Sequence, residues 1–159
     1  MDEVKEFIGL RKVRSIADYQ FGKGVGTKLF PDAVKLSFSS KTGRVRHIYL
    51  DDKLLATLRP NDGLLALSIE GAKRLQRILP PPKMRVVIDA KYESYVVKGK
   101  DVQTRWVKLA DPDIRPGDEV LVVNAHDELL AIGKAVLPGE WITTFKAGLA
   151  IKVRRGVGA

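Results

Sequence analysis

A run of three prolines, Pro80–Pro82, limits the fold of this chain more than any other feature of its 159 residues. Proline lacks a backbone N–H and pushes the residue before it out of the helical region, so neither a helix nor the middle of a sheet continues through the run. Just before it, apolar residues recur at helical spacing, which predicts a helix over Ile69–Leu79 capped by Ser68. We therefore expect two domains, residues 1–82 and 83–159.

The first half is expected to form an α+β domain. Leu10, Val13 and Ala17 lie on one face of a helix predicted over residues 3–19, which leaves its basic side chains to face solvent or a phosphate backbone. The glycine-rich residues 22–26 are expected to end this helix in a flexible turn. Alternating apolar residues and turn sequences then predict an antiparallel meander of short strands over residues 34–38, 44–50, 54–58 and 64–67.

The second half is expected to be mainly β and to close into a small barrel. A short helix is predicted over Ala90–Lys98, with Gly99 as its C-terminal stop. Gly133 lies inside a predicted strand, which indicates a bulge or the close approach of another backbone. Apolar runs that are too long for burial on one side predict strands near residues 86–88, 106–109, 120–123, 129–136 and 149–153.

The net charge of +9, with a pI near 9.8, suggests an anionic partner, for which nucleic acid and an acidic membrane face are the usual candidates. No apolar run approaches the ~18 residues of a transmembrane helix, and the N-terminus has neither the basic nor the apolar region of a secretory signal. We therefore expect a cytoplasmic protein without a membrane partner. The scarcity of Asn and Gln and the absence of Cys favour a thermophilic source.

The chain offers few side chains for catalysis or metal binding. It has no cysteine, and its two histidines, His47 and His126, have no nucleophile or carboxylate cluster near them in sequence. The glycine-rich segment of residues 22–28 places Thr before Lys and follows a helix, which is not the order of a phosphate-binding Walker loop. The carboxylates of residues 111–119 lack the spacing of a calcium loop and favour turns. We expect no catalytic residue, metal or cofactor.

Basic residues gather in several short segments of both halves. In an extended strand Arg44 and Arg46 share one face, and so do Lys152 and Arg154. A glycine between two lysines permits close approach of a phosphate or sugar, and a tryptophan beside an arginine can stack on a base. Together these segments predict an RNA-sized surface. Its candidate residues are Arg11, Lys12, Arg14, Arg44, Arg46, Lys98, Gly99, Lys100, Arg105, Trp106, Lys152, Arg154 and Arg155.

Motifs in both halves resemble known families. In the second half, five segments in the expected order resemble the PUA domain: Arg85–Asp89, Val97–Val102, Asp113–Asn124, Glu128–Ala135 and Gly148–Val153. In the first half, four segments are similar to the domain that precedes PUA in archaeal tRNA-guanine transglycosylases, enzymes of the archaeosine pathway: Arg14–Gly22, Leu29–Pro31, Thr42–His47 and Ser68–Arg74. The resemblance covers roughly residues 10–158.

The resemblance implies an α+β pre-PUA domain followed by a mainly β PUA pseudo-barrel that binds RNA, with the acceptor stem and 3′ end of tRNA as the expected target. In PUA domains RNA contacts the short helix, the glycine loop after it and the last strand, which correspond here to Lys98–Lys100, Arg105 and Lys152–Arg155. The transglycosylase reaction uses a TIM barrel of ~250 residues and a cysteine-based zinc site, and this chain has neither. The resemblance therefore implies a stand-alone or accessory subunit for tRNA modification, with catalysis on a separate subunit.

Two other functions stay open. The basic face could meet an acidic protein, which would make the chain an interaction subunit of an archaeal enzyme complex. The glycine-rich loop and His47 are the features that suggest an enzyme acting on a nucleoside.

Overall fold

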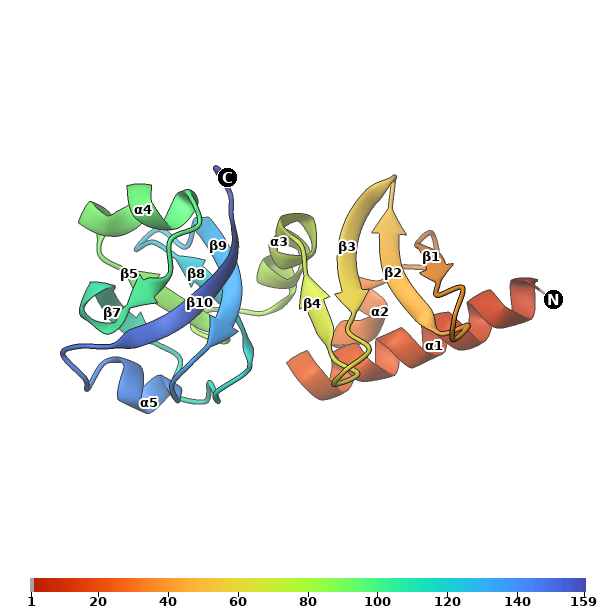
Figure 1. Ribbon diagram of the computed structural model, residues 1–159, viewed down its shortest axis with the longest axis horizontal. Helices are drawn as coiled ribbons and strands as arrows, with labels where there is room; N and C mark the ends of the chain where they lie inside the picture. The colour runs from red at the N-terminus through yellow and green to blue at the C-terminus, as the bar shows by residue number, and fades with distance from the viewer. Residues whose placement is uncertain (1) are drawn as a thin grey trace. The chain divides into compact units, whose positions relative to one another are not determined.

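A computed structural model describes residues 2–159, and the chain divides into two compact units, Met1–Ile78 and Leu79–Ala159. Each unit contains a sheet of its own (Figure 1). No helix within residues 2–159 is both long and apolar enough to cross a membrane.

The first unit is built on a four-stranded antiparallel meander with the order β1-β2-β3-β4, which confirms the predicted α+β class and strand order. Asp51 and Asp52 both have positive φ, the backbone form of a two-residue hairpin turn, and they join β2 to β3. The elements are α1 (Asp2–Phe21), α2 (Val25–Leu29), β1 (Lys35–Phe38), β2 (Val45–Leu50), β3 (Lys53–Leu58), β4 (Leu65–Leu67) and α3 (Ile69–Ile78).

Helix α1 is held by an apolar stripe and by one amide side chain. Val13, Ala17 and Phe21 are buried, as their spacing predicts. Near the end of the helix, Gln20 exchanges two hydrogen bonds with the backbone of Leu65. Its Nε2 donates to the carbonyl oxygen at 2.9 Å, and its Oε1 accepts from the N–H at 2.8 Å. These bonds tie the end of α1 to the last strand of the meander.

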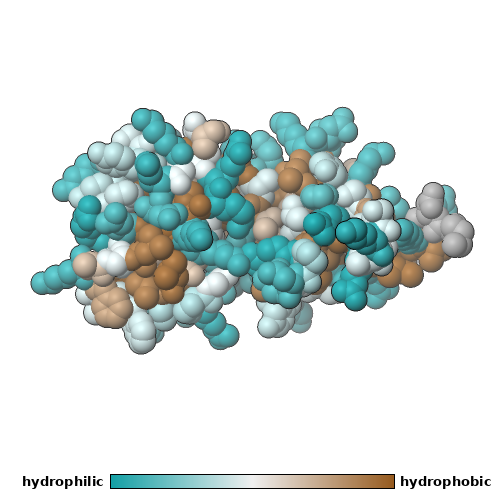
Figure 2. Space-filling model, in the orientation of Figure 1, coloured by the Kyte–Doolittle hydropathy of each residue, from teal (hydrophilic) through white to brown (hydrophobic). Residues whose placement is uncertain are grey.

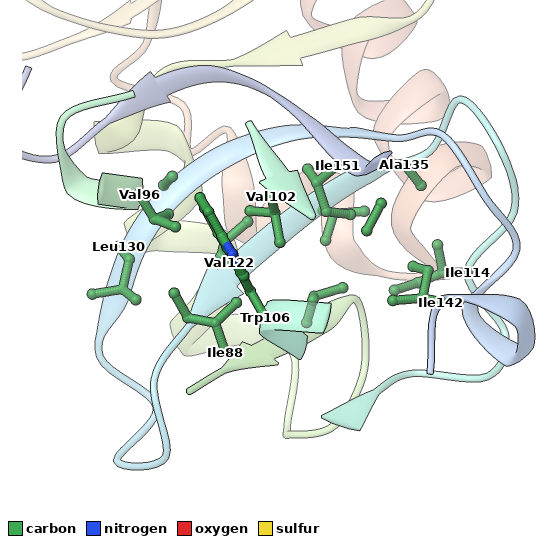
Figure 3. Close-up of a cluster of buried hydrophobic side chains, with 14 residues drawn as sticks. Ile88, Val96, Val102, Trp106, Ile114, Val122, Leu130, Ala135, Ile142 and Ile151 are labelled. Atoms are coloured by element: carbon green, nitrogen blue, oxygen red, sulfur yellow. The ribbon is translucent and has the colours of Figure 1, made fainter. Parts of the chain in front are cut away.

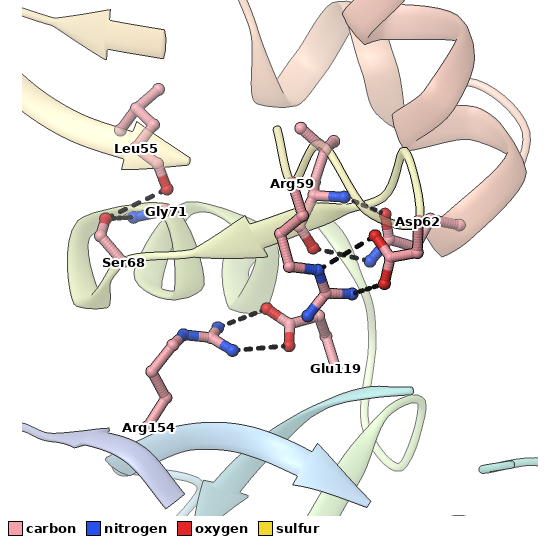
Figure 4. Close-up of polar contacts among 9 residues, drawn as sticks. Leu55, Arg59, Asp62, Ser68, Gly71, Glu119 and Arg154 are labelled. Atoms are coloured by element: carbon pink, nitrogen blue, oxygen red, sulfur yellow. Dashed lines mark hydrogen bonds and ion pairs between the residues drawn. The ribbon is translucent and has the colours of Figure 1, made fainter. Parts of the chain in front are cut away.

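Helix α3 begins at the predicted cap. The hydroxyl oxygen of Ser68 accepts a hydrogen bond from the backbone N–H of Gly71 at 3.0 Å, and the same hydroxyl lies 3.1 Å from the carbonyl oxygen of Leu55 (Figure 4). The helix ends at Ile78, one residue earlier than predicted, and so stops short of the prolines.

The glycine-rich residues 22–26 are not the flexible turn that the sequence predicts. They lead into the helix α2, which packs on α1 so closely that a Cβ atom on Gly26 would lie 2.2 Å from the carbonyl oxygen of Arg14. The backbone N–H of Gly26 also donates to Asp18 Oδ1 at 2.6 Å. Glycine is required here because two backbones are in contact, a condition that the sequence alone does not distinguish from a loop.

The second unit is mostly strand and forms the nearly closed, barrel-like sheet that the sequence predicts, in the order β6-β10-β9-β8-β5-β7. All its strand pairs are antiparallel except β5 with β8, a parallel pair that strand patterning did not specify. Its elements are β5 (Arg85–Ile88), η1 (Ala90–Tyr92), α4 (Glu93–Val97), β6 (Val102–Gln103), η2 (Thr104–Trp106), β7 (Val107–Ala110), β8 (Glu119–Val123), β9 (Leu129–Ala135), α5 (Gly139–Ile142) and β10 (Leu149–Gly156).

The core of this unit gathers around Trp106 (Figure 3). Val96, Val102 and Ile151 are fully buried and reach the core from α4, β6 and β10. One face of the Trp106 ring stacks on Tyr92, with ring centroids 4.9 Å apart and planes within 10°. The short helices and the sheet are therefore fastened to one another through a single aromatic side chain.

Gly133 on β9 marks a close backbone approach, one of the two alternatives that the sequence indicated. A Cβ atom at this position would lie 2.4 Å from the carbonyl oxygen of Lys152 on β10. The adjacent register shift, between Val153 and Arg155, lies in β10 itself. The missing side chain thus lets the two strands meet where β10 has an extra residue.

Arg85, at the start of β5, is the one arginine of residues 2–159 whose side chain is fully buried. Its Nη1 donates to the carbonyl oxygens of Leu79 at 2.7 Å and Lys83 at 3.0 Å. Its Nε and Nη2 donate to the two carboxylate oxygens of Asp127 at 3.1 and 3.2 Å. The guanidinium therefore fastens the proline segment and the β8–β9 hairpin to β5.

Candidate nucleic-acid interface

Strand β10 is the middle of the candidate interface because it carries three of the predicted basic residues. Lys152, Arg154 and Arg155 are exposed along it. The strand pairs with β9 on one side and β6 on the other. Its basic side chains are thus presented from a strand held by backbone hydrogen bonds.

The loop of residues 98–100 lies beside the C-terminal part of β10. The backbone N–H of Gly158 donates to the carbonyl oxygen of Val97 at 2.8 Å, just before the loop. Just after it, Asp101 Oδ1 accepts from the backbone N–H of Val153 at 2.8 Å. These bonds bring the loop and the last strand together.

Gly99 leaves open space beside this loop, while the backbone N–H groups of Gly99 and Lys100 donate to the carbonyl oxygens of Val96 and Tyr95. The φ of Gly99 is +101°, a value that L-residues rarely adopt, and no atom lies within 4 Å of the position that a Cβ atom would take. Lys98 and Lys100 on either side are exposed and make no ion pair among the residues that the structure describes. A phosphate can therefore approach between the two ammonium groups without meeting a side chain at position 99.

Two lysines occupy directly opposite positions on β9 and β10. Lys134 is the register partner of Lys152 on one side and of Glu119 on β8 on the other, so the three side chains share one face of the sheet. Like charges at directly opposite positions destabilise a sheet, typically by roughly 0.2–1 kcal/mol. A bound anion would relieve any repulsion of this kind between Lys134 and Lys152.

Arg154 is not simply an exposed cation. Its guanidinium forms a two-pronged ion pair with Glu119, in which Nη1 donates to Oε2 at 3.0 Å (Figure 4). The Glu119 side chain is fully buried, whereas 33% of the Arg154 side chain is exposed. Arg154 therefore neutralises a buried carboxylate, and its charge is not available to RNA in the way that the sequence predicts.

Arg105 lies near the other end of β10. It belongs to η2, directly after β6, and Gln103 of β6 is the register partner of Leu149 at the start of β10. The exposed guanidinium donates from Nη1 to Gln103 Oε1 at 2.7 Å. The amide orients Arg105 beside the strand and keeps it within the candidate interface.

Trp106 does not belong to the interface, and its predicted role in stacking on a base is corrected here. Only 7% of the residue is exposed. Its ring stacks on Tyr92 and also on Tyr95, with a centroid distance of 5.8 Å to the latter. Its indole Nε1 is buried without a hydrogen-bond partner. The sequence alone could not show whether the tryptophan that follows Arg105 packs inside the unit or lies on its surface.

The first unit has a cavity of about 110 Å³ that is lined by other predicted basic residues than those near β10. Lys12 of α1 and Arg44 and Arg46 of the first hairpin line it, together with Arg59 after β3. Arg59 is paired with Asp62 at 2.9 Å, whereas the other three make no ion pair among the described residues. The fold thus joins two basic segments that lie about thirty residues apart in the chain.

Arg11 and Arg14, the other predicted basic residues of α1, do not line this cavity. Arg14 donates from Nε to the carbonyl oxygen of Phe30 and from Nη2 to Asp32, both at 2.9 Å. It therefore holds the segment after α2, and the prediction that it faces solvent or a phosphate is wrong. Arg11 is exposed and lies 5.8 Å from the centre of the Phe7 ring.

Sequence reasoning missed Arg59 and Lys134. Arg59 stands alone between a strand and a turn, and Lys134 is one basic residue in an apolar strand, so neither belongs to a basic segment. Only the register of the sheets places them beside other cations. A search for charge at alternate positions of paired strands would have been needed to find Lys134.

The residues considered for other chemistry have structural roles. His47 Nδ1 lies 3.1 Å from the hydroxyl of Ser37 on the neighbouring strand. Asp111 Oδ1 accepts from the backbone N–H of Asp113 and Asp118 Oδ2 from that of Arg115, both at 2.9 Å, as expected of carboxylates in turns, and Asp111 Oδ2 also accepts from the distant backbone N–H of Met84 at 2.7 Å. No group of three or more acidic or histidine side chains within residues 2–159 is arranged to hold a metal ion.

Comparison with known proteins assigns both units. Residues 84–157 match the PUA domain family, and residues 11–82 match the patch-forming domain C2 of tRNA-guanine transglycosylase. The chain therefore belongs to the proteins that join these two domains.

Proteins with similar sequences are archaeal tRNA-guanine(15) transglycosylases. The chain is 54% identical over 145 residues to the tRNA-guanine(15) transglycosylase of Thermococcus kodakarensis, and 46% identical over 157 residues to that of Methanothermobacter thermautotrophicus. These alignments cover 91% and 98% of this chain but 25% and 24% of the relatives. The chain thus spans about a quarter of their length and corresponds to their C-terminal region. The archaeal, thermophilic sources agree with the sequence-based expectation.

Solved structures share the fold at low identity. A hypothetical protein from Pyrococcus horikoshii OT3 aligns with a TM-score of 0.75 and 23% identity, covering 96% of this chain and 92% of its own. A conserved PUA domain protein from Thermoplasma acidophilum aligns with a TM-score of 0.64 and 18% identity, covering 94% and 88%. The fold thus recurs in proteins of similar size.

Proposed function

We propose that this chain binds tRNA for a tRNA-modifying system, such as one that forms archaeosine, and does not itself carry out the chemistry. The observation that supports the proposal is that the residues flanking the 98–100 loop are bonded to the C-terminal part of the chain and to β10, where Lys98, Lys100, Lys152 and Arg155 are all exposed. The names of the relatives support tRNA as the substrate class. The catalytic residues are proposed to lie on a separate subunit or domain.

On this proposal the lysines and arginines position RNA rather than read its sequence. Ammonium and guanidinium groups contact phosphates, and each neutralised phosphate releases counterions, so binding weakens as salt rises. Gly99 contributes by leaving open space beside the loop for a phosphate or sugar. The resemblance to PUA domains supports the acceptor stem and 3′ end of tRNA as the part that is bound. The cavity lined by Lys12, Arg44 and Arg46 is proposed as a second contact for a phosphate of the same RNA.

The test is filter binding of the pure chain to tRNA with and without its 3′-CCA end, over a salt series. The variant replaces Lys98, Lys100 and Lys152 by Gln. We expect it to bind tRNA at least about tenfold more weakly and to lower the slope of log affinity against log salt by about 2, since each phosphate contributes about 0.7–0.9. Removal of CCA should weaken binding to the wild type.

A matched control replaces three exposed lysines outside the surface, Lys35, Lys53 and Lys108, by Gln. It removes the same charge and should retain nearly wild-type affinity and slope. Equal losses in the two variants would mean that net charge alone attracts RNA. A wild-type chain that does not bind tRNA at low salt would refute the proposed function. Unchanged binding after removal of CCA would refute the assignment to the 3′ end.

A second candidate function, a protein-interaction subunit, is favoured by one observation on α1. Val4, Phe7 and Ile8 are apolar and each is about 60% exposed. Exposed apolar clusters are a common mark of protein contacts. If this helix binds a catalytic subunit, that subunit should co-purify after nuclease treatment with the wild type and be lost with Phe7→Ser and Ile8→Ser. Loss of the partner on nuclease treatment alone would assign the association to RNA.

A further inference from the structure

The second unit exposes an aromatic pair that no sequence motif singled out. Trp141 is 51% exposed and Phe145 is 45% exposed. Their ring centroids lie 5.8 Å apart, with planes inclined by 48°. Figure 2 shows hydrophobic residues gathered on the surface of this unit, near α5 and the start of β10. Large aromatic side chains held at the surface mark a place where another molecule binds.

The pair is held in place by the local backbone. Trp141 is in α5, and its carbonyl oxygen accepts from the backbone N–H of Phe145 at 3.1 Å, which places the two rings one helical turn apart. The hydroxyl of Thr144 donates to the carbonyl oxygen of Glu140 at 2.8 Å and extends this turn. Between them, Ile142 is fully buried. The segment is therefore anchored on one side and shows its aromatic rings on the other.

The segment is continuous with the candidate interface. The carbonyl oxygen of Gly148 accepts from the backbone N–H of Thr104 at 2.9 Å, and Leu149 is the register partner of Gln103. Arg105 follows directly in the chain, and its guanidinium is oriented by the same Gln103. The turn that carries the aromatic pair thus ends against the element that carries Arg105, at the start of β10.

The charges around the pair favour a polyanion. Lys146 follows Phe145 and is exposed, and neither it nor Arg105 makes an ion pair among the described residues. Glu140 is the single carboxylate of residues 137–149. An aromatic ring flanked by cations suits unpaired nucleotides, because the ring stacks on a base while the cations meet the phosphates on either side.

We propose that Trp141 and Phe145 form a stacking platform for unpaired bases of RNA, continuous with the phosphate-binding surface along β10. This inference rests on the proposed function and deepens it, because it names single-stranded RNA as the ligand of this part of the surface. It also assigns to Trp141 the stacking role that the sequence had suggested for Trp106.

Tryptophan fluorescence tests the platform directly. The chain has two tryptophans, the buried Trp106 and the exposed Trp141. A short unstructured RNA that ends in CCA should quench the emission of the wild type through contact with Trp141. The variant Trp141→Phe retains only the buried indole, so the same RNA should leave its emission unchanged. Because the substitution is at the surface, the variant should fold, and its thermal transition checks this.

Affinity supplies the second readout. The double variant Trp141→Ala and Phe145→Ala should bind the single-stranded RNA at least about fivefold more weakly, the lower end expected for loss of a stacked base. A blunt RNA duplex should bind both proteins equally, because it offers no unpaired base. The control Val136→Ala truncates an exposed apolar side chain that has no ring to stack on a base, and it should leave both affinities unchanged.

The outcomes separate this inference from the proposed function. If the wild type binds RNA but its emission does not change, or if the double variant binds single strands as tightly as the wild type, the platform is refuted while RNA binding stands. If the wild type binds no RNA, the proposed function itself fails. If the double variant instead loses only concentration-dependent self-association, the aromatic pair is a protein contact and the inference is wrong.

Discussion

The ion pair between Arg154 and Glu119 makes a quantitative prediction about stability. The variant Arg154→Met keeps the apolar stem of the side chain and removes its charge. In the native protein the Glu119 side chain has no solvent exposure. In the variant this carboxylate loses its ion pair with Arg154. Removing one member of a buried pair costs more than the pair contributes, because the remaining charge is left desolvated.

The size of the effect follows from the burial of the two partners. Breaking a fully buried pair costs about 3–5 kcal/mol. Since 33% of Arg154 is exposed, water can reach part of the vacated space, and we expect a lower cost of about 2–3 kcal/mol. For a unit of this size, each kcal/mol lowers the melting temperature by about 4–8 °C, so the second unit should melt roughly 10–20 °C earlier.

Both tryptophans lie in the second unit, so urea unfolding followed by tryptophan emission reports on that unit alone. The neighbouring variant Arg155→Met removes an exposed charge from the same strand and should change the free energy of unfolding by less than about 0.5 kcal/mol. Adding Glu119→Gln to Arg154→Met should restore part of the lost stability. Equal stabilities of the two single variants would refute the reasoning about the buried carboxylate.

Three further predictions concern single positions. Gly26→Ala should unfold or strongly destabilise the first unit, because its Cβ would lie 2.2 Å from a backbone oxygen of α1; amide hydrogen exchange of α1 and α2 measures this, and a native-like exchange pattern would contradict it. Arg85→Met should lower the free energy of unfolding of the second unit by about 2–3 kcal/mol, since two backbone carbonyls lose a donor and the Asp127 carboxylate, of which 36% is exposed, loses its ion pair with Arg85; a loss below about 1 kcal/mol in urea would contradict it. Lys152→Gln should leave stability equal or slightly higher, because it relieves the repulsion with Lys134, and yet lower the salt slope of tRNA binding by about 1; a clear loss of stability in calorimetry would contradict it.

The elements and their order were largely predictable because they depend on local patterns. The Ser68 cap, the stop at Gly99 and the alternating strands of the meander follow from backbone chemistry and the spacing of apolar residues. The parallel pairing of β5 with β8 was not predictable in this way, since it depends on how distant strands enter a closed sheet.

The candidate site was predictable as a set of segments but not as a set of side chains. The resemblance pointed to the 98–100 loop and the last strand as places that RNA contacts, and the structure adds the backbone bonds that bring them together. The roles of Arg14, Trp106 and Arg154 were misjudged because each is decided by a distant partner: a carbonyl after α2, the Tyr92 ring of η1 and a buried carboxylate on β8. Sequence shows that a residue is charged or aromatic, and only packing shows whether it is free to bind.

The facing lysines of β9 and β10 give the free protein and its complex opposite responses to ionic strength. In the free protein, added salt screens the repulsion between Lys134 and Lys152, so the second unit should become slightly more stable, by a few tenths of a kcal/mol. In the proposed complex with RNA, the same salt would compete with phosphate for Lys152 and weaken binding. Raising the salt concentration should thus increase the stability of the free protein and decrease its affinity for RNA, and Lys152 contributes to both effects.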